Sequence, residues 1–230
     1  MLAHEKELLG FYVSGHPLTP FAPILDKYCL HNSVTAKELA PRTMSRLGGM
    51  ISSVQKGVSK KSGKAYCMVG IEDLHGSFSM LLVNETFDRY AHLVEPGKTI
   101  LVIGEVNNDE DKPKLFPQEV MALADAPKKY TLQVHFRLNL AHLNAALLDQ
   151  VHQLVAAHPG KCPLFLCFRQ PTGELIFIET HDRFYVTPSR ALQDAIDELL
   201  GEETYYAKVD QSLPQPERRR WERKAEPAAA

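Results

Sequence analysis

Four lysines lie close together in residues 55–66, a segment without any acidic residue. They are Lys56, Lys60, Lys61 and Lys64. Lysine ammonium groups neutralise phosphates and release condensed counterions, which gives binding that depends on salt and not on base sequence. A solvated surface loop is the alternative interpretation of the same segment. The lysines therefore indicate nucleic-acid binding only if neighbouring strands offer a surface to the bases.

Three further side chains could form such a surface. Tyr66 and Met68 are two residues apart, so they point to the same face of a strand. Phe78 lies in the next predicted strand, but the sequence pattern of that strand does not decide which face Phe78 points to. Unpaired bases stack on flat side chains, which is worth roughly 1–3 kcal/mol per base. We predict that Tyr66, Met68 and Phe78 bind nucleic acid together with the four lysines.

The elements that must position these residues follow from hydrophobic alternation and turn signals. Cys67, Val69 and Ile71 alternate with Tyr66 and Met68, which is typical of a strand with one buried face. Residues 46–127 contain predicted strands at 47–58, 65–73, 77–83, 98–106 and 114–124, with a helix at 85–93. Three strands, a helix and two strands predict an OB-fold β-barrel. In this fold, oligonucleotides bind to the loop between the first two strands and to the face of strands two and three.

The rest of the chain divides into three predicted parts. Residues 1–45 are predicted to be a helical or irregular segment, and residues 211–230 a disordered tail rich in proline and charge. Residues 128–210 predict a C-terminal α+β domain. We expect its strands at 130–138, 162–168, 174–179 and 205–209 and its helices at 140–155 and from the N-cap Thr187, through Pro188, to Gly201.

Composition and motifs exclude several functional classes. The net charge is -2, so any basic surface is local: residues 46–73 hold five lysines and arginines against two acids. The chain has no 18-residue apolar run, and acids in its first residues do not fit a signal peptide, so we expect a cytoplasmic protein without a membrane partner. The four cysteines form no CxxC pair and are predicted to be reduced core residues, Cys162 and Cys167 within one strand.

No catalytic or metal-ligand constellation is found in the sequence, and we expect no cofactor. Glu72 and Asp73 end a predicted strand before a turn, where acids are usually structural. The acidic run at 109–111 is predicted to be a turn as well.

The opening segment, residues 5–18, closely resembles a segment of the alpha subunit of bacterial DNA polymerase III, the C-family replicative polymerase. Residues 49–54, 62–64, 71–77 and 100–106, together with Tyr90, resemble the OB region that follows it in that family. The resemblance covers about residues 4–126 and is looser for the terminal domain. It implies that the chain corresponds to the C-terminal region of such a subunit, with residues 1–45 at the end of the polymerase finger region.

The resemblance carries functional implications. The family is a DNA-directed DNA polymerase, a nucleotidyltransferase, but its palm carboxylates lie upstream of this region, so we expect the chain to be inactive alone. Its OB domain is expected to bind the single-stranded DNA template, and its terminal domain to contact other holoenzyme subunits in the replisome, tau of the clamp loader among them. Family members often carry aromatics at the positions of Met68 and Val83. A scaffold whose barrel is only structural is the alternative function.

Overall fold

The computed structural model describes residues 17–60, 63–83, 85–108 and 112–216. Within them the chain separates into two compact units. The barrel unit comprises residues 17–25, 29–122 and 212–216, and the sheet unit comprises residues 26–28 and 123–211. The boundary thus falls slightly before the predicted one at 127. Residues 1–16 lie outside the described residues, and with them most of the segment 5–18 that carries the family resemblance. The same holds for Lys61, the acidic run 109–111 and the tail from residue 217 on.

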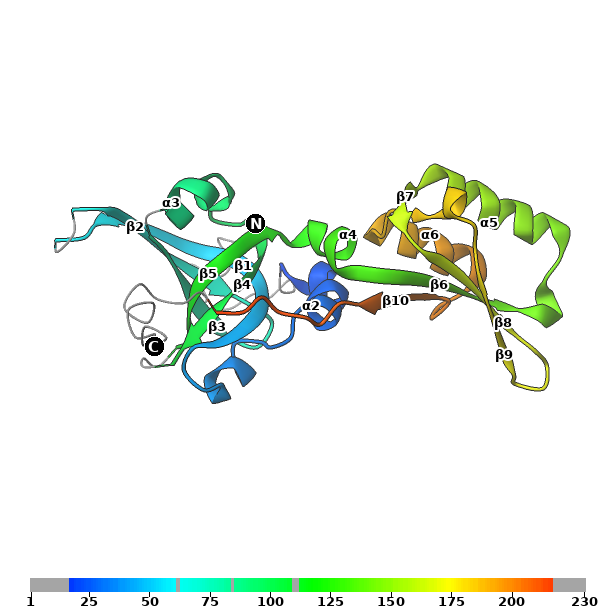
Figure 1. The fold of residues 1–230 in the computed structure, drawn as a ribbon, viewed down its shortest axis with the longest axis horizontal. Helices are drawn as coiled ribbons and strands as arrows, with labels where there is room; N and C mark the ends of the chain where they lie inside the picture. Colours follow the sequence, from blue (N-terminus) through cyan, green and yellow to red (C-terminus); the bar gives the residue numbers. More distant parts are fainter. Residues whose placement is uncertain (1–16, 61–62, 84, 109–111, 217–230) are drawn as a thin grey trace, which may run out of the picture. The chain divides into compact units, whose positions relative to one another are not determined.

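The barrel unit is built from five strands (Figure 1). They are β1 (Thr43–Val58), β2 (Ala65–Glu72), β3 (Ser77–Val83), β4 (Thr99–Asn107) and β5 (Lys114–Ala122). Its short helices are η1 (Thr19–Phe21), η2 (Thr35–Glu38), α3 (Glu85–Tyr90) and η3 (Ala91–Leu93), and α2 (Ala22–Tyr28) begins in this unit. All five predicted strands of the barrel are present, and the predicted helix at 85–93 is α3 followed by η3.

The barrel closes because β1 is long enough to serve two neighbours. Its first half, from Thr43 to Met50, pairs with β4, and its second half, up to Val58, pairs with β2. The strand order β1-β2-β3-β5-β4 then returns to β1, with the single parallel contact between β3 and β5. This closed five-stranded order confirms the predicted OB-fold.

Alternating apolar residues fill the barrel. On β2 the buried positions are Cys67, Val69 and Ile71, while Tyr66 and Met68 are half-buried on the other face, as the alternation predicts. Tyr90 of α3 packs against the same core and donates a hydrogen bond to the carbonyl oxygen of Gln118 at 3.2 Å. The inner positions of the strands thus fix which residues of the same strands face outward.

The sheet unit places two helices on one face of a four-stranded sheet. The elements are η4 (Leu123–Asp125), α4 (Ala126–Tyr130), β6 (Thr131–Asn139), η5 (Leu140–His142), α5 (Ala145–Ala157), β7 (Pro159–Cys162), β8 (Leu164–Arg169), β9 (Leu175–Glu179), η6 (Asp182–Phe184), α6 (Arg190–Leu200) and β10 (Tyr205–Val209). The strand order is β10-β6-β8-β9, parallel between β6 and β8 and antiparallel elsewhere. Val134 and Phe136 of β6 pack with Val151 of α5 and Ile196 of α6 in the core.

Two local predictions in this unit are wrong. Cys162 and Cys167 do not share a strand, because Pro163 separates β7 from β8 and has no N–H to donate to a ladder. The N-cap of α6 is Ser189, whose hydroxyl accepts a hydrogen bond from the amide of Leu192 at 3.1 Å. Thr187 instead donates its hydroxyl to the carbonyl oxygen of Pro159 at 2.6 Å.

Candidate nucleic-acid interface

The outer face of β2 and β3 forms the floor of a groove on the barrel unit. Tyr66 pairs with Val83 and Met68 with Leu81 across the antiparallel ladder, so the four side chains share one face. None of them belongs to the buried core, because the intervening residues of both strands point inward. The hairpin register therefore assembles one aromatic and three aliphatic side chains into a continuous apolar strip.

Gly57 of β1 determines where the Tyr66 ring lies. The two residues are directly opposite each other in the β1–β2 ladder. A Cβ atom built on Gly57 would lie 2.7 Å from both Cζ and Oη of Tyr66, so the ring extends over the glycine backbone. A glycine in a strand interior often marks such a close approach. The ring is thus held at the edge of the strip nearest β1.

The loop between β1 and β2 places two lysines at the end of this strip. The amide of Ser59 donates to the carbonyl oxygen of Lys64 at 2.9 Å, and the amide of Gly63 donates to that of Ser59 at 2.8 Å. Gly63 has a φ of 66°, a left-handed conformation that glycine adopts without steric cost. This tight connection brings Lys60 and Lys64 to the same groove.

The resulting groove has a volume of about 580 Å³. It is lined by Val58, Ser59, Lys60, Lys64, Ala65, Tyr66, Met68, Leu81 and Val83. Two cations stand beside an aromatic ring and an aliphatic floor, and no acidic residue is among the lining. This combination suits a ligand with both phosphates and flat apolar bases.

The structure separates two of the predicted residues, Phe78 and Lys56, from the groove. Phe78 pairs with Ile71 and is only 1% exposed in the barrel core, so the prediction that it offers a stacking surface is wrong. Lys56 pairs with Cys67 and points to the opposite face of the β1–β2 hairpin from Tyr66. Lys61 lies outside the described residues. The groove thus retains Lys60, Lys64, Tyr66 and Met68 of the predicted set.

Five lining residues were not singled out as binding residues: Val58, Ser59 and Ala65 next to the β1–β2 loop, and Leu81 and Val83 of β3. The signal for the two β3 residues was the short turn at residues 73–76, which pairs Glu72 with Ser77 and so fixes the register of the β2–β3 hairpin. Counting back from this turn puts Phe78 opposite Ile71, on the buried face, and Leu81 opposite Met68. Hairpin register follows from loop length and turn type in this way.

Asp73 has a structural role at the same turn, as the sequence suggested. Its buried carboxylate accepts hydrogen bonds from the amide and hydroxyl of Ser33 at 2.6 and 2.8 Å. It also accepts from the amides of His75 and Gly76, both at 2.8 Å. These four donors hold the carboxylate at the turn. Among the described residues, no cluster of three or more His, Cys, Asp or Glu side chains is placed to hold a metal ion.

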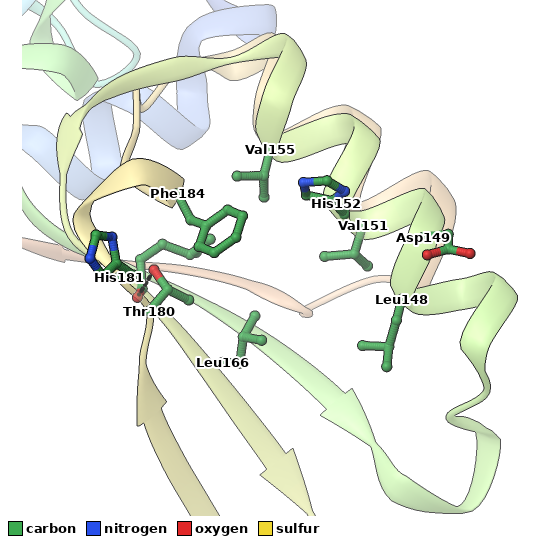
Figure 2. Close-up of a pocket in the computed structure, with 10 residues that line it drawn as sticks. Leu148, Asp149, Val151, His152, Val155, Leu166, Thr180, His181 and Phe184 are labelled. Carbon is green, nitrogen blue, oxygen red and sulfur yellow. Dashed lines mark hydrogen bonds between the residues drawn. The ribbon is translucent and has the colours of Figure 1, made fainter.

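A second, apolar groove lies in the sheet unit between α5 and the sheet (Figure 2). It has a volume of about 380 Å³ and is lined by Leu148, Asp149, Val151, His152, Val155, Leu164, Leu166, Thr180, His181 and Phe184. The rings of His152 and Phe184 meet edge to face, with centroids 5.7 Å apart, across its opening. Thr180 satisfies its hydroxyl within the wall by donating to the carbonyl oxygen of Leu164 at 3.0 Å.

One part of the chain matches a known domain family, and most of the chain aligns with curated proteins. Residues 46–123 match the family described as an OB-fold nucleic acid binding domain. A protein of Saccharopolyspora erythraea named DNA polymerase III subunit alpha is 26% identical over 209 residues, and one of Neisseria meningitidis with the same name is 27% identical over 210 residues. Each alignment covers 87% of this chain and 17% of the relative. A protein of Escherichia coli O157:H7 with this name is 25% identical over 91% of the chain and 18% of its own length.

Among solved structures, a domain of replication protein A from Methanococcus maripaludis covers 40% of this chain and 94% of its own, at 18% identity and a TM-score of 0.32. The helices of the described residues include none with the length and apolar content needed to cross a membrane.

The chain spans less than a fifth of the length of its curated relatives and contains a closed OB barrel. It is therefore a homologue of the bacterial DNA polymerase III alpha subunit, consistent with the C-terminal region of that subunit.

Proposed function

We propose that this chain is a non-catalytic part of a replicative polymerase alpha subunit whose barrel binds single-stranded DNA template in the cytoplasm. The observation that supports this function is the groove in which Lys60 and Lys64 stand at the end of a strip formed by Tyr66, Met68 and their β3 partners. Phosphates contact the lysines and unpaired bases lie on the strip. A duplex would not fit this role, because its bases are already stacked on each other.

The chemistry of the groove predicts the form of the binding. Two lysine contacts are a small electrostatic footprint, so affinity should be weak and should fall as salt rises. Each phosphate neutralised in a single strand contributes a slope of about 0.7 to the plot of log affinity against log salt. Tyr66 is the one aromatic side chain among the lining residues, so stacking should involve one base and little sequence preference.

Fluorescence anisotropy with a labelled oligothymidylate tests this function. The double variant Lys60→Ala and Lys64→Ala should bind more weakly than the unmodified chain and with a salt slope lower by about 1.4. Lys56→Ala is the matched control, because Lys56 belongs to the same hairpin but points to its other face. Equal affinities for the double variant and the unmodified chain would remove the groove from this function.

The apolar groove of the sheet unit supports a second role, the recruitment of another holoenzyme subunit. Leu148 of α5, in the groove lining, is 39% exposed, and Ile178 of β9, which is 50% exposed, pairs with Leu166 on the same face of the sheet. Exposed apolar surface of this extent is typical of protein-interaction sites. We propose tau of the clamp loader as the partner, which the family resemblance suggests. If the barrel binds no DNA, this scaffold role is the function that remains.

Titration calorimetry with purified tau tests the partner. Leu148→Asp should abolish binding, whereas Gln153→Asp, an exposed position on the same helix but outside the groove lining, should not. Binding of tau by the Leu148 variant with unchanged affinity would contradict this role.

We also propose that the chain alone does not extend a primer in the presence of Mg²⁺. Measurable primer extension would contradict the non-catalytic role.

A further inference from the structure

The face of the sheet unit opposite its helices carries a row of aromatic rings. Tyr206 of β10 pairs with His135 of β6, and His135 pairs with Phe165 of β8, so the three side chains share that face. Phe177 of β9 shares it as well, because it pairs with Cys167, two residues along β8 from Phe165. In the described part of this unit, α5 and α6 both pack on the other face. Each of the four strands thus contributes one ring.

The rings contact one another around His135. Its imidazole stacks on Phe165, with centroids 5.0 Å apart and an interplanar angle of 17°. Phe177 and Tyr206 meet the same imidazole edge to face, at 6.1 Å and 5.7 Å. Phe177 is 58% exposed and Tyr206 45% exposed, although a ring that served only the core would be buried. These contacts hold a continuous aromatic surface that remains open to solvent.

Cations surround the aromatic row. The guanidinium carbon of Arg137 lies 5.3 Å from the ring centroid of Tyr206, and Nζ of Lys27 lies 5.8 Å from it. Lys208 and Arg169 project from the same face, on β10 and β8. The positive potential reaches the row itself: burial lowers the pKa of His135, and the charges of Lys208 and Arg137 lower it further. His135 is therefore a neutral flat ring at neutral pH.

The same sheet face carries little negative charge. Of the strand residues that the register assigns to it, Glu179 is the acidic one, at the end of β9. Its carboxylate accepts a hydrogen bond from the hydroxyl of Tyr185 at 3.3 Å. Arginine, lysine and exposed rings together favour a ligand that carries negative charge and flat unpaired rings.

We propose that this open sheet face is a second binding surface for single-stranded nucleic acid, separate from the groove of the barrel. Bases stack on Phe177 and Tyr206, and Arg137, Arg169 and Lys208 contact the phosphates. Four-stranded sheets with exposed aromatics bind single strands in this manner. A protein partner is less suited to this face than to the apolar groove on the helix side, where the lining contains no lysine or arginine.

The test uses the full chain with Lys60→Ala and Lys64→Ala already in place, so that the barrel contribution is reduced. Anisotropy with labelled oligothymidylate then compares Phe177→Ala and Tyr206→Ala with Ile176→Ala. Ile176 is the matched control, because it is 42% exposed on the same strand as Phe177 but on the opposite face. Each aromatic variant should weaken binding about 5- to 150-fold, and Ile176→Ala should leave it unchanged.

Two further variants separate stacking from folding and from charge. Phe177→Trp keeps a flat ring and should keep the affinity. If Phe177 had only a structural role, Phe177→Ala and Phe177→Trp would both lower the melting temperature. Arg137→Ala should lower the salt slope by about 0.7. Equal affinities for the Phe177, Tyr206 and Ile176 variants would overturn this surface while leaving the barrel groove intact. If the Phe177 and Tyr206 variants change only self-association, measured by sedimentation, the sheet face is a protein contact and the proposed nucleic-acid surface is overturned.

Discussion

Replacing Gly57 by alanine should separate binding from stability. The new methyl group would lie 2.7 Å from Cζ and Oη of Tyr66, closer than side chains pack, so the ring must move. The obstacle is the far end of a flexible side chain and not backbone, so the strand itself need not shift. Gly57 is not among the glycines with positive φ, so alanine fits its backbone. Stability should therefore stay constant or rise by about 0.4–1 kcal/mol, because alanine restricts the unfolded chain.

The same substitution should weaken DNA binding. If the displaced ring loses one stacked base, the cost is roughly 1–3 kcal/mol, or a 5- to 150-fold rise in Kd. Anisotropy measures the affinity, and urea unfolding followed by circular dichroism measures the stability. Tyr66→Ala completes a double-mutant cycle, and Gly57→Ala should have no further effect in its presence. Normal affinity in both single variants, with the fold intact, would refute the stacking role of Tyr66.

Three further outcomes are expected. Asp73→Ala should lower the free energy of unfolding of the barrel unit, measured with urea, by about 1–3 kcal/mol, because it leaves the buried amide of Ser33 without its acceptor, whereas Asp88→Ala at an exposed position of α3 should have little effect. Ser189→Ala should cost about 1 kcal/mol through loss of the α6 N-cap, and Thr187→Ser, which keeps its hydroxyl, much less. Burial raises the pKa of the Cys162 thiol to about 11, so at pH 8 its labelling by a thiol reagent should be much slower in the folded than in the urea-unfolded chain, and equal rates would contradict its burial.

The sequence was sufficient for the barrel because its strands alternate and are separated by clear turn signals. Period-two spacing alone placed Cys67, Val69 and Ile71 on one face of the strand and Tyr66 and Met68 on the other. The β8–β9 hairpin was also predictable in outline: strands were expected at 162–168 and 174–179, and Gly173, with a φ of 91°, lies in the turn that joins β8 to β9. Local chemistry determines these features.

Features that depend on register were harder to predict. Alternation gives two faces for Phe78 and Lys56 but does not say which face is the core, and only the pairing with Ile71 and Cys67 decides it. Competing caps caused the errors at the starts of α5 and α6. Asn144 caps α5 by accepting from the amide of Leu147 at 2.9 Å, so the helix begins at Ala145 and not near Leu140.

Photo-crosslinking maps the DNA on the chain and tests the barrel groove most directly. A 4-thiothymidine oligonucleotide bound to the full chain would be irradiated, and the labelled peptides identified by mass spectrometry. We predict crosslinks to residues that line the groove, above all Tyr66, Met68 and Leu81, and their loss in the Lys60→Ala, Lys64→Ala variant. Bound oligonucleotide that crosslinks elsewhere on the chain and never to these residues would contradict the central claim.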